Sequence, residues 1–317
     1  MQAAVIERYG DPPVMRDVPN PSPGDGDIVI DVLAAPMNPV DISIAGGRFY
    51  RGSPPTPFVP GREGVGRVAR GGRVRPGARV YFNNGGPHGS FAQQSMIGEP
   101  LVVEVPDGVS DALAASLGIP TLSAWLALTW RANLRKGETV LVLAASGVVG
   151  AVAVQAARLL GAGRVVAAAR DAAGLRHALA LGADAAVDLT STDGLPEKFK
   201  EAAGGAIHLV IDPLWGPPGL AALQALERGG RLLQMGQSAG NEVPLLSSLV
   251  RGRMLTILGF TLFDVPWDVT ASAFRTLADH AAAGRLRVEH ETFPLDQAPE
   301  VWKRQSTSPH KKLVLIP

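Results

Sequence analysis

Val140-Leu-Val-Leu-Ala-Ala-Ser-Gly-Val-Val-Gly150 is the stretch that decides how this chain folds. Its first four residues form a short apolar run, which is typical of a parallel strand buried on both faces. Ala145-x-Gly147-x-x-Gly150 follows, and the Ala-rich residues 151–160 continue as a helix. A strand, a glycine turn and a helix start present unpaired backbone N–H groups and a positive helix end to a phosphate. The stretch therefore predicts a dinucleotide site. The alternative is a structural turn that only needs small residues.

The expected cofactor contacts in this turn are Ser146, Gly147, Val148, Val149 and Gly150. Glycine suits the position because a Cβ would keep the backbone from approaching the ligand.

Length and composition limit the class of protein. A chain of 317 residues with 46% hydrophobic content predicts two domains with large cores. The net charge of +1 predicts neither a nucleic acid nor a membrane as partner. The absence of cysteine excludes disulfides, thiolate nucleophiles and zinc sites with cysteine ligands. No segment looks like a secretory signal or a membrane span, so we expect a cytoplasmic protein.

Short strands and dense turns dominate the first part of the chain. Pro- and Gly-rich turns separate five predicted strands, and this pattern favours a small antiparallel barrel or sandwich. These strands are expected at residues 3–6, 27–33, 64–69, 79–82 and 101–105.

From residue 139 onward, strands and helices alternate, which indicates a doubly wound parallel sheet. The tail, residues 265–317, ends in a predicted strand from Lys312 to Ile316 and most simply rejoins the first domain. The strands of the sheet are expected at 139–144, 163–169, 185–188, 207–211, 230–235 and 255–260.

The residues after the second strand of this sheet predict which nicotinamide is bound. NAD enzymes usually place Asp or Glu at this strand end, about 20 residues after the glycine turn. Here Arg170 follows Ala169, and an arginine can pair bidentately with a 2′-phosphate. Arg176 lies one turn into the next helix and can assist. We therefore predict NADPH. Two alternatives remain open. Arg170 can be a surface residue with no role in binding, or Asp171 can be the residue that accepts from the ribose hydroxyls.

A series of motifs runs along nearly the whole chain: Asn38-Pro-Val-Asp41, Pro60-Gly-Arg-Glu-Gly-Val-Gly66, Gly89-Ser-Phe-Ala92, Ala144-Ala-Ser-Gly-Val-Val-Gly150, Leu181-Gly-Ala-Asp184, Val210-Ile-Asp212, Gly229-Gly-Arg-Leu-Leu-Gln-Met-Gly236 and Lys312-Leu-Val-Leu. Together they resemble the medium-chain dehydrogenase/reductase superfamily, and within it the zinc-free quinone oxidoreductase branch. The resemblance implies an α/β protein with a β-rich GroES-like catalytic domain (residues 1–118 and 261–317) and an inserted Rossmann NADP-binding domain (residues 119–260). It also implies a homodimer formed through strand 255–260. The alternative to a dimer is that another part of the same chain covers this strand.

Zinc members of the superfamily have ligands that this chain lacks. Their first catalytic ligand is a cysteine, where this chain has Asn38-Pro-Val-Asp41, and their Gly-His-Glu is replaced by Gly61-Arg62-Glu63. The cysteines of their structural zinc lobe are missing too. The six histidines show no ligand spacing, so we expect no metal site.

Three polar side chains are the candidates for catalysis. Asn38, in the segment that resembles the family's Asn-Pro, can donate to a carbonyl or orient the nicotinamide amide. Formation of the turn before Pro39 is its alternative role. Tyr50 is a possible proton donor, although the family's tyrosine matches Phe49 or Tyr50 equally well. Arg62 replaces the zinc-binding histidine and can stabilise an enolate or bind a carboxylate.

Pairing of Arg62 with Glu63 or Asp41 is the alternative for that arginine. For Asp41 itself, capping of the helix that starts there is favoured over a chemical role.

Further candidates for cofactor binding come from the resemblance and from strand ends. Ser123 resembles the family's Thr/Ser on an interdomain helix, and Lys312 resembles the lysine of its terminal Gly-Lys. Gly236 and Ser238 follow the fifth strand of the parallel sheet, where open α/β sheets bind ligands. Phe260 is the last residue of the predicted sixth strand. The acceptor pocket is expected to be lined by aromatic residues, for which core packing is the alternative: Phe49, Tyr50, Trp125, Phe260 and Phe263.

A nicotinamide passes hydride to an electron-poor acceptor that is held close to it. An alcohol dehydrogenase needs a Lewis acid or another means of removing the hydroxyl proton. The sequence therefore predicts a zinc-independent NADPH quinone reductase, with reduction by one or two electrons left open. The alternatives are an enoyl or 2-alkenal reductase, which acts on an α,β-unsaturated carbonyl, and a non-catalytic NADPH-binding protein.

Overall fold

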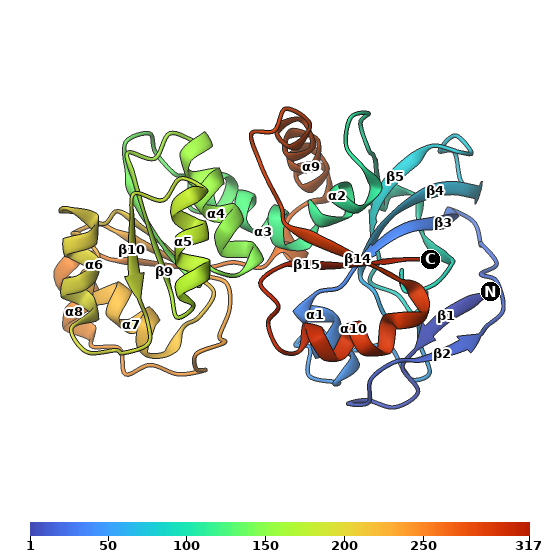
Figure 1. Ribbon diagram of the computed structural model, residues 1–317, viewed down its shortest axis with the longest axis horizontal. Coiled ribbons are helices and arrows are strands. Elements are labelled where there is room, and N and C mark those ends of the chain that lie inside the picture. The colour runs from blue at the N-terminus through green and yellow to red at the C-terminus, as the bar shows by residue number, and fades with distance from the viewer. The chain divides into compact units, whose positions relative to one another are not determined.

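The computed structural model describes residues 1–317, which divide into two compact units. The first unit comprises Met1–Pro120 and Pro266–Pro317, and the second comprises Thr121–Val265. Both termini belong to the first unit, as Figure 1 shows. No helix is both long and apolar enough to cross a membrane.

The first unit is built on a mainly antiparallel sheet with strand order β14-β15-β3-β4-β5-β7, in which β6 also pairs with β3. The long central strand β3 (Asp27–Pro36) pairs with β4 (Glu63–Gly71), β6 (Gln94–Gly98) and the last strand, β15 (Lys312–Ile316). The pairing of β15 with β3 brings the end of the chain back to the first unit. The remaining strands of this sheet are β5 (Arg79–Asn83), β7 (Val102–Glu104) and β14 (His290–Pro294).

A two-stranded sheet and four helices complete this unit. The small sheet pairs β1 (Gln2–Val5) with β2 (Val14–Asp17). In Figure 1, α2 (Asp111–Ser116) and α9 (Trp267–Ala282) lie on one side of the main sheet, and α1 (Pro39–Ala45) and α10 (Ala298–Gln305) lie on the other. The five strands predicted in the first part of the chain are present, whereas β2, β6 and β14 were missed; a turn was expected at Phe293.

The second unit is a doubly wound parallel sheet of six strands, with order β10-β9-β8-β11-β12-β13. This is the predicted Rossmann architecture. β8 is buried along its whole length, which explains its uninterrupted apolar sequence. The strands are β8 (Thr139–Leu143), β9 (Arg164–Ala169), β10 (Ala185–Asp188), β11 (Leu209–Asp212), β12 (Arg231–Gln234) and β13 (Thr256–Gly259).

Helices cover both faces of this sheet (Figure 1). α4 (Val148–Leu159) and α5 (Ala172–Ala180) lie on one face, and α6 (Leu195–Ala203), α7 (Gly216–Ala225) and α8 (Ser247–Arg253) lie on the other. α3 (Ile119–Leu126) begins in the first unit and continues into the second, where a π-helical turn at Ala127–Arg131 follows it.

Candidate functional site

The glycine turn between β8 and α4 leaves a helix N-terminus open to a ligand. Gly147 is the N-cap of α4 and provides no side-chain cap, so the first N–H groups of this helix are available to an anion. An ideal Cβ on Gly147 would have its nearest neighbour, the Ala144 oxygen, 3.5 Å away, whereas one on Gly150 would lie 2.3 Å from that oxygen. Gly150 is therefore needed for the helix to pack closely against Ala144, whereas Gly147 leaves open space beside the turn. The turn fits a dinucleotide pyrophosphate.

A glycine outside the turn supports it. A Cβ on Gly174, in the first turn of α5, would lie 2.2 Å from the Ser146 Cβ. Gly174 therefore allows α5 to pack against the turn that holds Ser146. This contact was missed, because Gly174 lies 28 positions from Ser146 in the sequence and only the fold brings the two together.

Most predicted cofactor residues meet at one edge of the parallel sheet. Ser146–Gly150 follow β8, and Arg170 follows the neighbouring strand β9. Gly236 and Ser238 follow β12, and Phe260 follows β13. Since all these strands are parallel, their carboxyl ends share one edge, where doubly wound sheets bind ligands. The Arg170 side chain is exposed at this edge, and so is Arg176 one turn into α5.

The loops after β11 and β12 pack tightly against each other. A Cβ on Gly236 would lie 2.5 Å from the Pro213 oxygen, and the Ser238 hydroxyl donates to that oxygen at 3.3 Å. Asp212, at the end of β11, accepts the backbone N–H groups of Leu214 and Trp215, each at 2.8 Å. Burial raises the pKa of Asp212 above its ordinary value. The structure therefore shows Asp212 as an organiser of this edge, a role that its position in a family motif did not reveal.

Two predicted site residues of the first unit are committed to the protein interior. Asn38 is 1% exposed, and both of its amide protons are used, toward Pro36 O at 3.2 Å and Glu63 Oε1 at 2.9 Å. Lys312 is 2% exposed, and its Nζ donates to the Met37 oxygen and to Asn38 Oδ1. The structure therefore does not support Asn38 as a donor to an acceptor carbonyl, or Lys312 as a cofactor ligand.

Asp41 connects the start of α1 to the start of β4. Its two carboxylate oxygens accept the backbone N–H groups of Asn38 at 2.8 Å and Arg62 at 2.9 Å. Desolvation by burial raises the pKa of Asp41 to about 6, against the lowering effect of these two hydrogen bonds and of Lys312. The capping role expected for Asp41 is therefore observed.

The other two catalytic candidates are more accessible. The Tyr50 side chain is 68% exposed, and its ring centroid lies 4.8 Å from that of Phe49. Arg62 is half-buried, with its guanidinium 5.7 Å from the centre of the Phe49 ring. Glu63, the partner considered for Arg62, instead accepts from Asn38, Tyr81 and Ile119.

The remaining predicted residues lie in helices or loops of the second unit. Ser123 and Trp125 lie on α3, each 8% exposed. Phe260 is half-buried, 6.5 Å from the Trp130 ring, and Phe263 is half-buried in a short helical turn at Leu262–Asp264.

The donor set in the first unit does not suit a zinc ion. Zinc in proteins is bound by thiolates, imidazoles and carboxylates. Here the corresponding positions hold the Asn38 amide and the Arg62 guanidinium, and the Glu63 carboxylate is already occupied by hydrogen-bond donors. No group of three or more His, Asp or Glu side chains is arranged to hold a metal ion.

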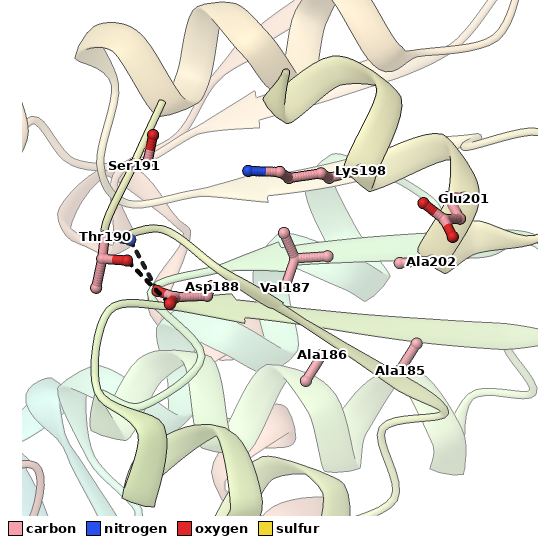
Figure 2. Close-up of a pocket in the computed structure, with 9 residues that line it drawn as sticks. All are labelled: Ala185, Ala186, Val187, Asp188, Thr190, Ser191, Lys198, Glu201 and Ala202. Carbon is pink, nitrogen blue, oxygen red and sulfur yellow. Dashed lines mark hydrogen bonds between the residues drawn. The ribbon is translucent and has the colours of Figure 1, made fainter. Parts of the chain in front are cut away.

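A hollow of about 490 Å³ lies along β10, at one edge of the second unit's sheet (Figure 2). Lys198 and Glu201 of α6 border it, and Asp188 accepts from the backbone and hydroxyl of Thr190 at 2.8 and 2.9 Å. None of the predicted site residues lines this hollow, so we assign it no part in cofactor binding.

Comparison with known proteins agrees with this architecture. Residues 24–107 match the family described as alcohol dehydrogenase GroES-like domain, and residues 148–281 match the family described as zinc-binding dehydrogenase. A quinone oxidoreductase from Lama guanicoe is 30% identical, with 100% of this chain and 97% of the relative covered.

Two solved structures are similar over the whole chain. One is a mycobacterial protein complexed with NADPH (TM-score 0.88, 25% identity, all of both chains covered). The other is an NAD-dependent alcohol dehydrogenase (TM-score 0.88, 28% identity, all of both chains covered).

Proposed function

The chain belongs to the medium-chain dehydrogenase/reductase superfamily, in its quinone oxidoreductase-like branch, and from this premise we propose that it reduces a quinone or a similar electron-poor acceptor with NADPH and without zinc. Membership of this superfamily makes the protein an oxidoreductase that uses a nicotinamide cofactor. The observation that carries the proposal is the uncapped start of α4 after the Gly147 turn, with Arg170 exposed at the end of the neighbouring strand.

The chain's own residues support NADPH over NADH. The N–H groups of Ser146–Gly150 would hold the pyrophosphate, and the Arg170 guanidinium would pair with the 2′-phosphate. Asp171, the alternative ribose ligand, is used as the N-cap of α5. The NADPH complex of one similar structure points the same way, and the NAD-dependent enzyme among the others makes a direct comparison of the two cofactors necessary.

When bound, the reduced nicotinamide supplies a hydride, which with one proton from solvent converts a quinone to a hydroquinone. Zinc independence is supported by the donor set around Asn38 and Arg62, which offers amide and guanidinium groups in place of metal ligands. Arg62 and Tyr50 are the side chains that we propose to contact the acceptor. Arg62 would stabilise negative charge on the acceptor's oxygen, and the exposed Tyr50 would border the acceptor.

We also propose that two copies pair through β13. This strand is the last in its sheet, no strand of the same chain pairs with its outer side, and Ile257 on it is 36% exposed. An open apolar edge of this kind needs covering. Pairing of two β13 edges across a two-fold axis would provide this, because such an interface uses the same surface of both copies.

A steady-state assay tests the proposed function. Oxidation of NADPH by 1,4-benzoquinone, with hydroquinone as product and no loss of rate after chelation of metals, is the expected result. Turnover of enones but not of quinones would favour the C=C reductase. Tight NADPH binding without turnover of either acceptor class would favour the non-catalytic protein.

A further inference from the structure

A buried polar network in the first unit joins segments that are far apart in the sequence. We call it the Glu63 network: Asn38, Glu63, Tyr81, Lys312 and the backbone N–H of Ile119. Its four side chains are each at most 2% exposed. Glu63 lies at its centre. Its Oε1 accepts from Asn38 at 2.9 Å, and its Oε2 accepts from the Tyr81 hydroxyl at 2.7 Å and from Ile119 N at 2.6 Å.

Lys312 balances the charge of this carboxylate. Its Nζ lies 3.6 Å from Glu63 Oε1 and donates to Met37 O at 3.1 Å. It also donates to Asn38 Oδ1, which fixes the orientation of that amide. The ammonium group is thus held by two hydrogen bonds, to Met37 O and Asn38 Oδ1, and by the ion pair with Glu63.

The contact with Ile119 lies at the start of α3. Ile119 is the first residue of this helix, whose first N–H groups have no partner within the helix. A carboxylate at this end is also favoured by the helix dipole. Gly118 allows the approach, because a Cβ on it would lie 1.9 Å from Glu63 Oε2.

Stabilisation of the fold alone does not explain why Glu63 and Lys312 are charged residues. Desolvation of a buried ion pair offsets most of its attraction, and apolar side chains of similar volume are often as stabilising. What the ion pair provides and apolar side chains do not is a fixed acceptor for Tyr81 and Ile119.

We propose that Glu63, held by Lys312, is a positioning residue that fixes the first turn of α3 and thereby Ser123, which lies four residues further along the same helix. The part that concerns Ser123 rests on the proposed NADPH function. The anchoring of α3 does not.

Glu63→Asp is the most informative variant. It keeps the charge opposite Lys312 but withdraws the carboxylate by one methylene from Ile119 N. Hydrogen exchange measured without cofactor is expected to be about tenfold faster at the amides of Ile119, Thr121, Leu122 and Ser123. The Kd and KM for NADPH are expected to rise by a similar factor, with a smaller change in kcat. Glu291→Asp, at an exposed ion pair with Arg304, is the matched control and should change neither readout.

A second variant separates positioning from folding. Glu63→Met/Lys312→Met removes both charges and is expected to melt above either single variant, while exchange at residues 119–123 stays fast and NADPH binding stays weak. Wild-type exchange in both Glu63→Asp and the double variant would overturn the anchoring role. Fast exchange with wild-type NADPH affinity would overturn the link to Ser123. If the wild-type protein binds no NADPH, the proposed function fails, and the exchange data still decide the anchoring.

Discussion

Asp171 Oδ2 accepts a hydrogen bond from the backbone N–H of Gly174 at 2.6 Å. This bond makes Asp171 the N-cap of α5 and engages one of its two carboxylate oxygens, so Asp171 has a structural role at the place where NAD enzymes hold the ribose. Arg170, the residue before it, is exposed and is therefore the group at this strand end that is available to a cofactor phosphate.

Arg170→Ala is expected to weaken NADPH binding by about 1.5–3 kcal/mol and to leave NADH binding nearly unchanged, because only NADPH has the 2′-phosphate. Titration calorimetry with both cofactors measures this. Arg8→Ala, an exposed arginine in the first unit, is the control. Equal losses for both cofactors would show that Arg170 does not recognise the phosphate.

Asp171→Ala is expected to lower the free energy of unfolding by about 1 kcal/mol, since it removes a helix cap. The ratio of NADPH to NADH affinity should not change. Chemical denaturation and cofactor titration measure the two effects. A large shift of that ratio toward NADPH would instead assign Asp171 to the ribose.

The two glycines of the turn are expected to differ in their response to alanine. Gly150→Ala places a Cβ 2.3 Å from the Ala144 oxygen and should destabilise the protein by about 1–3 kcal/mol. Gly147→Ala meets nothing closer than 3.5 Å, so it should keep the melting temperature and reduce cofactor affinity, because its methyl group enters the space for the pyrophosphate. Thermal melts and NADPH titration separate the two. A Gly147→Ala protein with wild-type affinity would contradict the assignment of the turn.

Asp41 predicts a pH dependence of stability. Burial raises its pKa from 3.8 to about 6, so the folded protein holds this proton more tightly than the unfolded chain does. The free energy of unfolding should therefore fall as pH rises through this window, by about 3 kcal/mol in all. Asp41→Asn lacks this contribution. Its stability relative to wild type should improve between about pH 4 and pH 8, and a constant difference in urea melts over that range would refute the assignment.

A charge on the outer strand edge tests the dimer. Ile257→Lys, on the exposed edge strand β13, is expected to convert the protein to a monomer, because a buried unpaired charge opposes pairing. Ala186→Lys, at the opposite edge strand β10, should leave the mass unchanged. Light scattering measures both. A monomeric wild-type protein would disprove the proposal.

Local patterns explain why much of the fold could be predicted. The alternation of strands and helices identified all six strands of the second unit. The four central strands are largely buried, which explains their apolar sequences. β2, β6 and β14 were missed. Most of their side chains are exposed or half-buried, so they lack the apolar run that marks a buried strand. The predicted cofactor residues that follow strands also reached a common edge, since the carboxyl ends of parallel strands do so by construction.

The sequence by itself determined the two fold types, the glycine turn and the arginine beside it, because each depends on residues that are close together in the chain. Only the tertiary structure decided the roles of Asn38, Glu63 and Lys312. Their side chains come from positions 38, 63 and 312, and a buried amide, carboxylate and ammonium must satisfy each other when water is excluded. No local pattern reports which partners meet in that interior.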